Sequence, residues 1–400
     1  MFKSIKNLIA PATMSVAAIS AASPAAMAAE IIVAPADYAF VNAANPGKGY
    51  FDVMVQTILI HNDGAAPVTL TALQIDVFGD GSSMLNKSVP VDRVIGQTRE
   101  FAGMAAQGFT VFLNAQLLNE AGIISMLGDG AAFAANQVLA PGEALIATSQ
   151  YFATDIEPGQ IVITASFIND EGELLSARRS LKVRRRHQEI DYIAPLKGAW
   201  LMRAFPNVRS HHRFIPSNEF ALDFFKTGAD GALDNGGRKS ATDDFGFGQP
   251  IHAVADGEVI FVIDDQTQDP EALMRQDGES IKDARARITR YQMGRFAENF
   301  RAAAAGNLVT IKHEKDGQTE YSSYGHLDSG SVAVTVGDRV KQGDVIGLVG
   351  NTGDSTLTHL HFQLNDGADA FHTRSLPVTF SNAEPLYMGQ DPGLFMKFGE

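Results

Sequence analysis

The sequence of 400 residues predicts a mainly β protein, with an N-terminal antiparallel β-sandwich-like domain followed by a β-rich domain that carries a helical insertion. Short runs rich in β-branched residues, bounded by Gly, Asn and Asp turns, recur along the chain and predict strands. One polar stretch, residues 264–306, interrupts them and spaces its apolar residues for a helix. The chain is too long for one ordinary domain, so we expect at least two.

The composition excludes several classes of function. The net charge of −14 leaves no basic face large enough for nucleic acid to be the main partner. The absence of cysteine excludes disulfides, thiolate metal sites and lipid attachment to an N-terminal cysteine. An apolar fraction of 45% is normal for a globular protein and allows a sizeable core.

Residues 1–28 have the pattern of a secretory signal peptide. Two lysines precede an uncharged stretch rich in Ala and Ser, which ends in the small-x-small cleavage pattern Ala26-Met27-Ala28. A transmembrane anchor fits less well, because Pro11 and Pro24 break the segment and it is weakly hydrophobic. We expect export across the inner membrane to a periplasmic or extracellular location, without stable membrane insertion after cleavage. Secretion without cysteine favours a bacterial envelope.

Residues 29–190 are expected to form the β-sandwich-like domain. Turn residues separate its predicted strands, which are 51–60, 68–78, 144–149, 160–167 and 174–183. A helical patch near 112–127 is expected to cross one end of the sandwich. His61 is a lone histidine beside a turn, and no catalytic constellation is visible. We interpret the domain as a structural, positioning or partner-binding module, with an envelope protein as the expected kind of partner.

A linker at 191–197 leads into the second domain, which we expect at 198–380, and residues 381–400 are expected to form a C-terminal tail. The helical insertion, 264–306, separates two predicted strands of this domain. It fits either a lid over a cleft or a solvated excursion, and the sequence does not decide between them.

Eight of the ten histidines lie between His211 and His372, so the chemistry of the chain is expected in the second domain. His359 and His361 form a His-x-His pair whose side chains share one face of a strand, because strand side chains alternate with a period of two. Asp223 lies between apolar residues in another strand, where a buried carboxylate needs a partner that a metal would supply. Taken alone, the histidine pair fits surface or hydrogen-bonded residues as well as metal ligands or a ligand beside a proton carrier.

Five motifs in one order resemble a known family. They are Ser-His-His with Ala-Leu-Asp-Phe, Val-Ala-Asp-Gly-Glu-Val, Tyr-Gly-His-Leu, Val-Gly-Asp-Arg-Val-Lys-Gln-Gly-Asp-Val-Ile-Gly, and Gly-Asn-Thr-Gly with Thr-His-Leu-His-Phe. Each motif is weak alone, but their order over residues 198–380 is similar to that of peptidase family M23, the LytM or lysostaphin type of zinc metallopeptidase. The resemblance does not cover the N-terminal half.

The resemblance implies roles for five residues that match the family's metal-binding and catalytic positions. They are His212, Asp223 and His361 as zinc ligands, and His326 and His359 as the catalytic pair. In a catalytic site, Zn²⁺ with three protein ligands keeps a position for water and lowers the pKa of that water to about 7. Imidazoles, with an unperturbed pKa of about 6.5, are suited to orient the water and to move protons.

The chain departs from the family at the first ligand. The family commonly places that histidine four residues before the aspartate, where this chain has Glu219. We align to members with a longer loop, so His211 competes with His212 and Glu219 is a more distant candidate. Tyr324 is expected on the same strand face as His326, where it either contributes a hydrogen bond or packs in the ordinary way.

The resemblance implies a zinc-dependent endopeptidase that hydrolyses the peptide cross-links of bacterial peptidoglycan. The sequence leaves open which cross-link is cut. The alternative is a non-enzymatic protein of the same type that binds and activates another cell-wall hydrolase. Because every candidate position is filled, the enzyme is favoured. A lipoyl- or biotinyl-like carrier, suggested by the Val-Lys-Gln-Gly-Asp-Val-Ile-Gly stretch, is discounted because the required lysine turn is absent.

Overall fold

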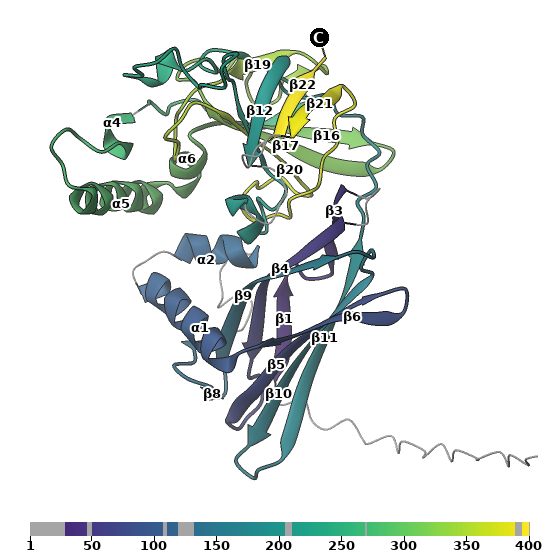
Figure 1. Ribbon diagram of the computed structural model, residues 1–400. Helices are drawn as coiled ribbons and strands as arrows, with labels where there is room; N and C mark the ends of the chain where they lie inside the picture. Colours follow the sequence, from purple (N-terminus) through teal and green to yellow (C-terminus); the bar gives the residue numbers. More distant parts are fainter. Residues whose placement is uncertain are drawn as a thin grey trace, which may run out of the picture.

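The structure is a computed structural model that describes residues 29–45, 50–106, 110–118, 132–204, 210–268, 270–388 and 394–399. The N-terminal β-sandwich lies below the C-terminal β domain, with helix α2 (Thr110–Leu117) at the junction between them (Figure 1). The expected signal peptide lies outside the described residues. Within those ranges, no helix has both the length and the hydropathy needed to cross a bilayer.

Two sheets form the N-terminal sandwich within the described ranges. The first contains β1 (Glu30–Ala34), β3 (Asn42–Asn45), β4 (Tyr50–His61), β7 (Ala132–Phe133) and β9 (Glu143–Thr154). The second contains β2 (Tyr38–Phe40), β5 (Val68–Gly79), β6 (Ser82–Val89), β8 (Val138–Leu139), β10 (Gln160–Asn169) and β11 (Leu174–Arg184). The pairings are antiparallel except β2 with β11 and β7 with β9, which confirms the predicted antiparallel sandwich.

Strand β4 is buried on both of its faces. Val53 and Val55 on one face pack into the core between the two sheets. The other face carries polar residues, among them Asp52 and Gln56, which are at most 1% exposed. This face meets the C-terminal domain, because β4 contacts the short helical turn η2 (His211–Phe214) of that domain.

The helical part of the N-terminal domain differs from the prediction. The helix α1 (Val91–Ala106) was missed, although Val94, Thr98 and Phe101 recur at helical spacing and are its buried residues. Helix α2 covers the beginning of the patch predicted at 112–127, and the residues from 119 onward lie outside the described ranges.

A sheet of nine strands, counted within the described residues, forms the C-terminal domain. In spatial order these are β18 (Arg339–Val340), β15 (Gly257–Ile263), β16 (Asn307–Lys315), β17 (Gln318–Leu327), β20 (Leu360–Asn365), β13 (Leu222–Phe225), β12 (Gly198–Ala204), β22 (Leu394–Phe398) and β21 (Ala383–Met388). A separate pair joins β14 (Pro250–His252) to β19 (Val345–Leu348). Together with the sandwich, these sheets confirm the mainly β fold class.

Residues 381–400 contain two strands rather than an isolated tail. Strand β22 pairs with β12 at the edge of the large sheet, and β21 pairs with β22. Phe398 is 2% exposed and belongs to the same apolar cluster as Trp200 and Phe224. The prediction of a tail was therefore wrong, because this short segment buries an aromatic residue in the core of the domain.

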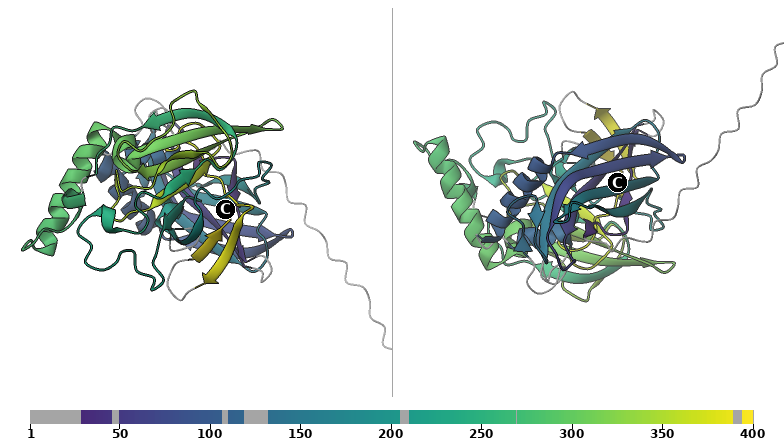
Figure 2. Two further views of the ribbon diagram at one scale, coloured as in Figure 1. Left: turned by 90° about the horizontal axis from the view of Figure 1, so that it is seen from above. Right: turned by 90° about the horizontal axis from the view of Figure 1, so that it is seen from below.

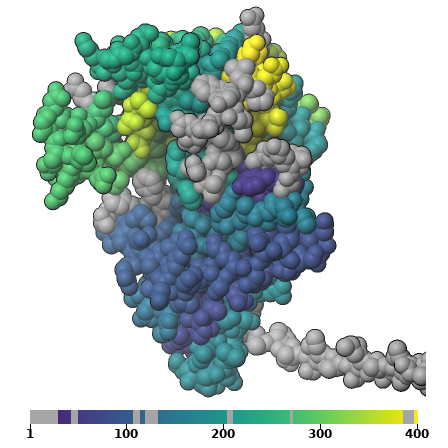
Figure 3. Space-filling view, in the orientation of Figure 1, coloured from purple at the N-terminus to yellow at the C-terminus, as the bar shows by residue number. Residues whose placement is uncertain are grey.

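The insertion forms three helices, which confirms the predicted helical character: α4 (Pro270–Leu273), α5 (Ile281–Glu298) and α6 (Phe300–Ala305). Helix α5 begins after Ser280, whose hydroxyl accepts a hydrogen bond from Asp283 N and so caps the helix. Figures 2 and 3 show this helix projecting from the side of the molecule. The β15–β16 pairing continues up to the insertion, because Ile263 lies opposite Leu308.

Candidate metal and catalytic site

Three neighbouring strands bring the predicted site residues together. Strands β17, β20 and β13 are adjacent in the large sheet, and Asp223 on β13 is directly opposite His361 on β20. On the other side of β20, Gly325 on β17 is opposite His361, and His326 follows it. His359 lies immediately before β20.

Asp223 is the centre of a buried histidine cluster. The distances from its carboxylate oxygens are 3.1 Å to His361 Nδ1, 3.5 Å to His212 Nε2 and 3.6 Å to His359 Nε2. The ring of His326 lies 4.6 Å from that of His359, measured between centroids. None of the five residues is more than 8% exposed except His361, which is of intermediate burial. The structure thus brings together all five residues to which the resemblance gives roles.

One ring nitrogen of each histidine is held by a protein oxygen. Nδ1 lies 3.3 Å from Ala221 O in His212, 2.8 Å from Thr352 O in His326 and 2.7 Å from Leu357 O in His359. A backbone carbonyl only accepts hydrogen bonds, so these contacts place a proton on Nδ1. In a neutral ring, Nε2 then keeps its lone pair. The nitrogens that face Asp223 in His212 and His359 can therefore accept a proton or a cation.

His361 is oriented the opposite way. Its Nε2 lies 2.8 Å from Gln363 Oε1, and the amide nitrogen of Gln363 donates to Asn365 Oδ1 and Ala370 O, which identifies Oε1 as the acceptor. In a neutral His361, the lone pair of Nδ1 would thus point at Asp223 Oδ1, which lies 3.1 Å away. Two acceptors at this distance repel unless a proton or a cation lies between them. The residues present therefore fit a bound cation.

The pKa values agree with this geometry. Burial would raise the pKa of Asp223, but the surrounding histidines outweigh it and hold that pKa well below its usual range. Burial lowers the pKa of His212 to about 3 and also lowers those of His326 and His359. For His361, burial opposes protonation, but the hydrogen bond and charge of Asp223 raise its pKa. These directions favour an ionised Asp223 beside neutral rings of His212, His326 and His359, whereas Asp223 favours the protonated form of His361.

His326 has an unusual backbone conformation. Its φ of 63° is in the left-handed region, which costs a residue with a side chain about 1–2 kcal/mol. The β16–β17 register shifts at this point, between the pairs of Asn307 and Val309. Such strain persists only where the surroundings enforce it. Here the hydrogen bond from His326 to Thr352 O does so.

The register shift reverses the expected position of Tyr324. Ser323 and His326 line the same cavity, which a regular strand with a period of two would not allow. Tyr324 is fully buried in the core, with its ring 5.3 Å from that of Phe362, and its hydroxyl accepts a hydrogen bond from Val254 N. The expectation that Tyr324 shares a face with His326 was therefore wrong, whereas the packing interpretation agrees with this position.

Two of the three candidates for the first ligand, His211 and His212, lie on η2. His211, His212 and Asp223 offer ligand atoms within 4.8 Å of one another. His212 is 4% exposed, whereas His211 is exposed. Glu219 is buried and its Oε1 lies 3.2 Å from Arg213 Nη2, so its carboxylate pairs with arginine.

A cavity of about 210 Å³ opens beside the cluster and is lined by His211, His212, His326 and His361. Phe296 of α5 and Phe300 of α6 contribute from the insertion, and Ala115 and Gln116 of α2 contribute from the N-terminal domain. The far end of α5 is solvated, since Ile281 is 69% exposed. The insertion therefore covers the cavity with one end and extends into solvent with the other.

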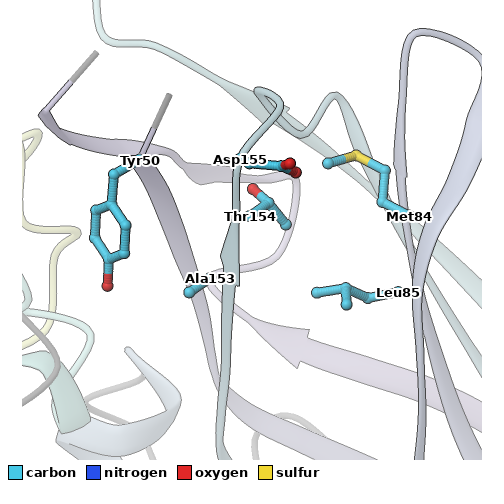
Figure 4. A pocket seen from close by; sticks show the side chains of 6 residues that line it. All are labelled: Tyr50, Met84, Leu85, Ala153, Thr154 and Asp155. Atoms are coloured by element: carbon cyan, nitrogen blue, oxygen red, sulfur yellow. The ribbon is translucent and has the colours of Figure 1, made fainter. Parts of the chain in front are cut away.

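A second hollow lies in the N-terminal domain, between β4, β6 and β9 (Figure 4). Its volume is about 340 Å³, and Tyr50, Met84, Leu85 and Asp155 are among its lining residues. These side chains include one carboxylate and no histidine, so they lack the convergent donors of the C-terminal cluster. Among the described residues, the side chains that could hold a metal ion therefore lie beside β13 and β20.

Sequence reasoning missed several supporting residues. Gln363 fixes the proton on His361, and Phe225 stacks on the ring of His359 at a centroid distance of 4.8 Å. Ser355 Oγ lies 3.2 Å from His359 Nδ1. Gln363 was available to the strand pattern, because it lies two residues after His361 and so shares its face.

Comparison with known proteins gives a match to the family described as Peptidase family M23, over residues 284–373. This range contains His326, His359 and His361 but not His212 or Asp223. An uncharacterised metalloprotease of Buchnera aphidicola is 47% identical over 60 residues, which is 15% of each chain. The peptidoglycan DD-endopeptidase ShyA of Vibrio cholerae is 45% identical over 60 residues, 15% of this chain and 13% of that protein.

The chain thus spans about 15% or less of the length of these two relatives. Among solved structures, the catalytic domain of lysostaphin from Staphylococcus simulans is 18% identical with a TM-score of 0.22, covering 46% of this chain and 88% of that chain. The family match confirms the resemblance inferred from the motifs.

Proposed function

We propose that this chain, which carries a Peptidase family M23 domain, is a zinc-dependent endopeptidase that hydrolyses peptide cross-links of bacterial peptidoglycan. One observation supports the proposal above the others. Nε2 of His212 and Nδ1 of His361 lie 3.5 Å and 3.1 Å from oxygens of the buried Asp223 carboxylate, an arrangement that a divalent cation stabilises. The peptidoglycan DD-endopeptidase among the relatives supports the choice of substrate.

In this proposal His212, Asp223 and His361 hold the zinc ion, and His211 is the exposed alternative to His212. When bound, the ion supplies a Lewis acid and lowers the pKa of a water ligand. Two imidazoles and one carboxylate leave a divalent ion with residual positive charge. Gln363 keeps the proton of His361 on Nε2, so that Nδ1 remains a ligand atom.

His326 and His359 carry the proton transfers. Thr352 O and Leu357 O hold their Nδ1 protons, so Nε2 of each ring accepts a proton from the attacking water or returns one to the leaving amine. Burial lowers both pKa values and keeps the rings neutral before the reaction. Stacking of Phe225 on His359 fixes the plane of that ring.

The direct test is a digest of purified bacterial sacculi with residues 29–400, with and without a chelator, followed by mass identification of the released muropeptides. Loss of cross-linked dimers that stops with chelator and returns with Zn²⁺ is the expected result. His361→Ala removes a ligand and is expected to abolish release. Full activity in that variant would refute the ligand assignment.

The same digest separates the enzyme from the non-enzymatic alternative. If no muropeptide is released with Zn²⁺ present, the protein should be added to sacculi with a second cell-wall hydrolase. Faster release by that hydrolase would support an activator and would contradict the endopeptidase proposal.

We infer a periplasmic or extracellular location from the signal-like pattern of residues 1–28. N-terminal sequencing of the protein recovered from an expressing bacterium is expected to begin at Ala29. A mature chain that retains residues 1–28 would contradict the inference.

A further inference from the structure

The polar face of β4 holds the histidine turn of the other domain. Asp52 Oδ1 lies 2.5 Å from Arg213 Nη1, and Gln56 Nε2 donates to Arg213 O at 3.4 Å. Asn42 Nδ2 donates to the second oxygen of Asp52 at 2.9 Å and so orients the carboxylate. Arg213 directly follows His212 on η2. A side chain of the N-terminal domain is therefore fixed one residue away from a proposed zinc ligand.

This contact is fully removed from solvent. Arg213 is 0% exposed, Asp52 1% and Glu219 4%. Arg213 lies between the two carboxylates, with its Nη2 3.2 Å from Glu219 Oε1. Because water does not reach this depth, removal of either carboxylate leaves the buried guanidinium of Arg213 with only one negative partner. The position of η2 is thus coupled to the presence of Asp52.

The two carboxylates that flank Arg213 come from different domains. Glu219 precedes β13 within the C-terminal domain, whereas Asp52 comes from the sandwich. Glu219 stands at the position where the family commonly has its first ligand. In the proposed site the first ligand is instead His212 on η2, and residues of both domains contact that turn.

We propose that Asp52, through Arg213, is a positioning residue for the metal site, and that the N-terminal domain thereby sets the affinity of the chain for zinc. The inference rests on the proposed function, since it assumes that His212 is a ligand. It assigns to the sandwich domain a direct part in building the site. In this proposal the sandwich domain holds η2, with His212, next to Asp223.

A second buried ion pair provides a matched control. Arg186 Nη2 lies 2.5 Å from Glu320 Oε2, and both side chains are at most 6% exposed. Tyr192 also donates to Glu320, at 2.6 Å. This pair resembles the Arg213–Asp52 pair in burial and length, but its contacts do not involve the histidine cluster. Glu320→Gln therefore removes a comparable charge without touching η2.

The test is a Zn²⁺ titration of the full chain against a chromophoric chelator, with wild type, Asp52→Asn and Glu320→Gln compared. Loss of a group that orients a metal ligand typically weakens affinity about 10–100-fold, and we expect this of Asp52→Asn. Glu320→Gln is expected to remain within about twofold of wild type. The visible spectrum of bound Co²⁺ gives a second readout, and it should change in Asp52→Asn alone.

The outcomes distinguish the positioning role of Asp52 from the zinc peptidase proposal. Equal zinc affinity in wild type and Asp52→Asn would overturn the positioning role and leave the zinc peptidase intact. Equal losses in Asp52→Asn and Glu320→Gln would also overturn it, because they would reflect general destabilisation. A wild-type chain that binds no zinc would overturn both claims. If Asp52→Asn does not fold, Gln56→Ala provides the same comparison through the contact with Arg213 O.

Discussion

Replacing Tyr324 by Phe separates packing from catalysis in the strand that carries His326. The hydroxyl of Tyr324 accepts hydrogen bonds from Val254 N and from Ser322 Oγ, both at 3.0 Å. The phenylalanine ring keeps the contact with Phe362 and removes only the oxygen. We expect a loss of stability without a loss of hydrolysis, because the side chain is fully buried and does not line the cavity.

The magnitude follows from the donors left behind. Ser322 Oγ retains a second partner, His313 Nε2 at 2.7 Å, so its hydroxyl is still satisfied. The backbone N–H of Val254 is left without its acceptor in a buried position. An unsatisfied buried donor costs about 1–3 kcal/mol, which is the expected decrease in the free energy of unfolding of the C-terminal domain.

The assay uses the single tryptophan of the chain. Trp200 is 1% exposed and belongs to the core of the C-terminal domain, so its fluorescence in a denaturant titration reports the unfolding of that domain. Hydrolysis of sacculi is measured under conditions in which both proteins are folded. Unchanged stability together with a tenfold loss of hydrolysis would show that the hydroxyl acts in the reaction, and would refute this reasoning.

Two further predictions concern the insertion. Gly306→Ala should decrease both stability and hydrolysis, because φ of Gly306 is 65° and a Cβ there would lie 2.4 Å from the backbone of Thr352, whose carbonyl holds His326. Thermal unfolding measures the loss of stability, and the sacculus digest measures the loss of hydrolysis. A variant that matches wild type in both measurements would contradict the close approach. Asp369→Asn should destabilise the protein at pH 7 by removing the ion pair with Arg301 of α6. Burial would raise the pKa of Asp369, but its hydrogen bonds lower it. This stabilisation is present above the unfolded pKa of about 3.9 and is lost as the pH falls through the folded value. The difference in unfolding free energy between variant and wild type should therefore shrink below pH 4, and a constant difference would contradict the assignment.

Local patterns singled out three of the five candidate site residues, and the family resemblance supplied His212 and His326. The alternation of side chains placed His359 and His361 on one face, and the cost of a buried carboxylate singled out Asp223. The strand order then joined them, because β13 and β20 are neighbours although Asp223 and His361 are 138 residues apart. The order of the family motifs predicted that these distant residues lie close together, which side-chain periodicity alone did not.

The errors have equally specific causes. The period of two failed at His326, where a positive φ accompanies a register shift, so that His326 and Tyr324 lie on opposite faces. No local sequence pattern predicts a positive φ at this histidine. The conformation is held by a hydrogen bond to Thr352 O, which lies in a loop distant in sequence. The pair of Asp52 with Arg213 also escaped detection, since it joins residues 161 positions apart in different domains.

The ends of the helical insertion lie side by side, because β15 and β16 pair as neighbours with Ile263 opposite Leu308. In topological terms the whole segment is an enlarged hairpin loop, and the strands on either side would pair in the same way around a short turn. Phe296 and Phe300 reach the cavity from this loop, whereas the proposed ligands lie outside it. Part of the cavity lining and the proposed metal ligands are thus contributed by separate stretches of the sequence, so the loop can be changed in length or composition without altering the ligand residues.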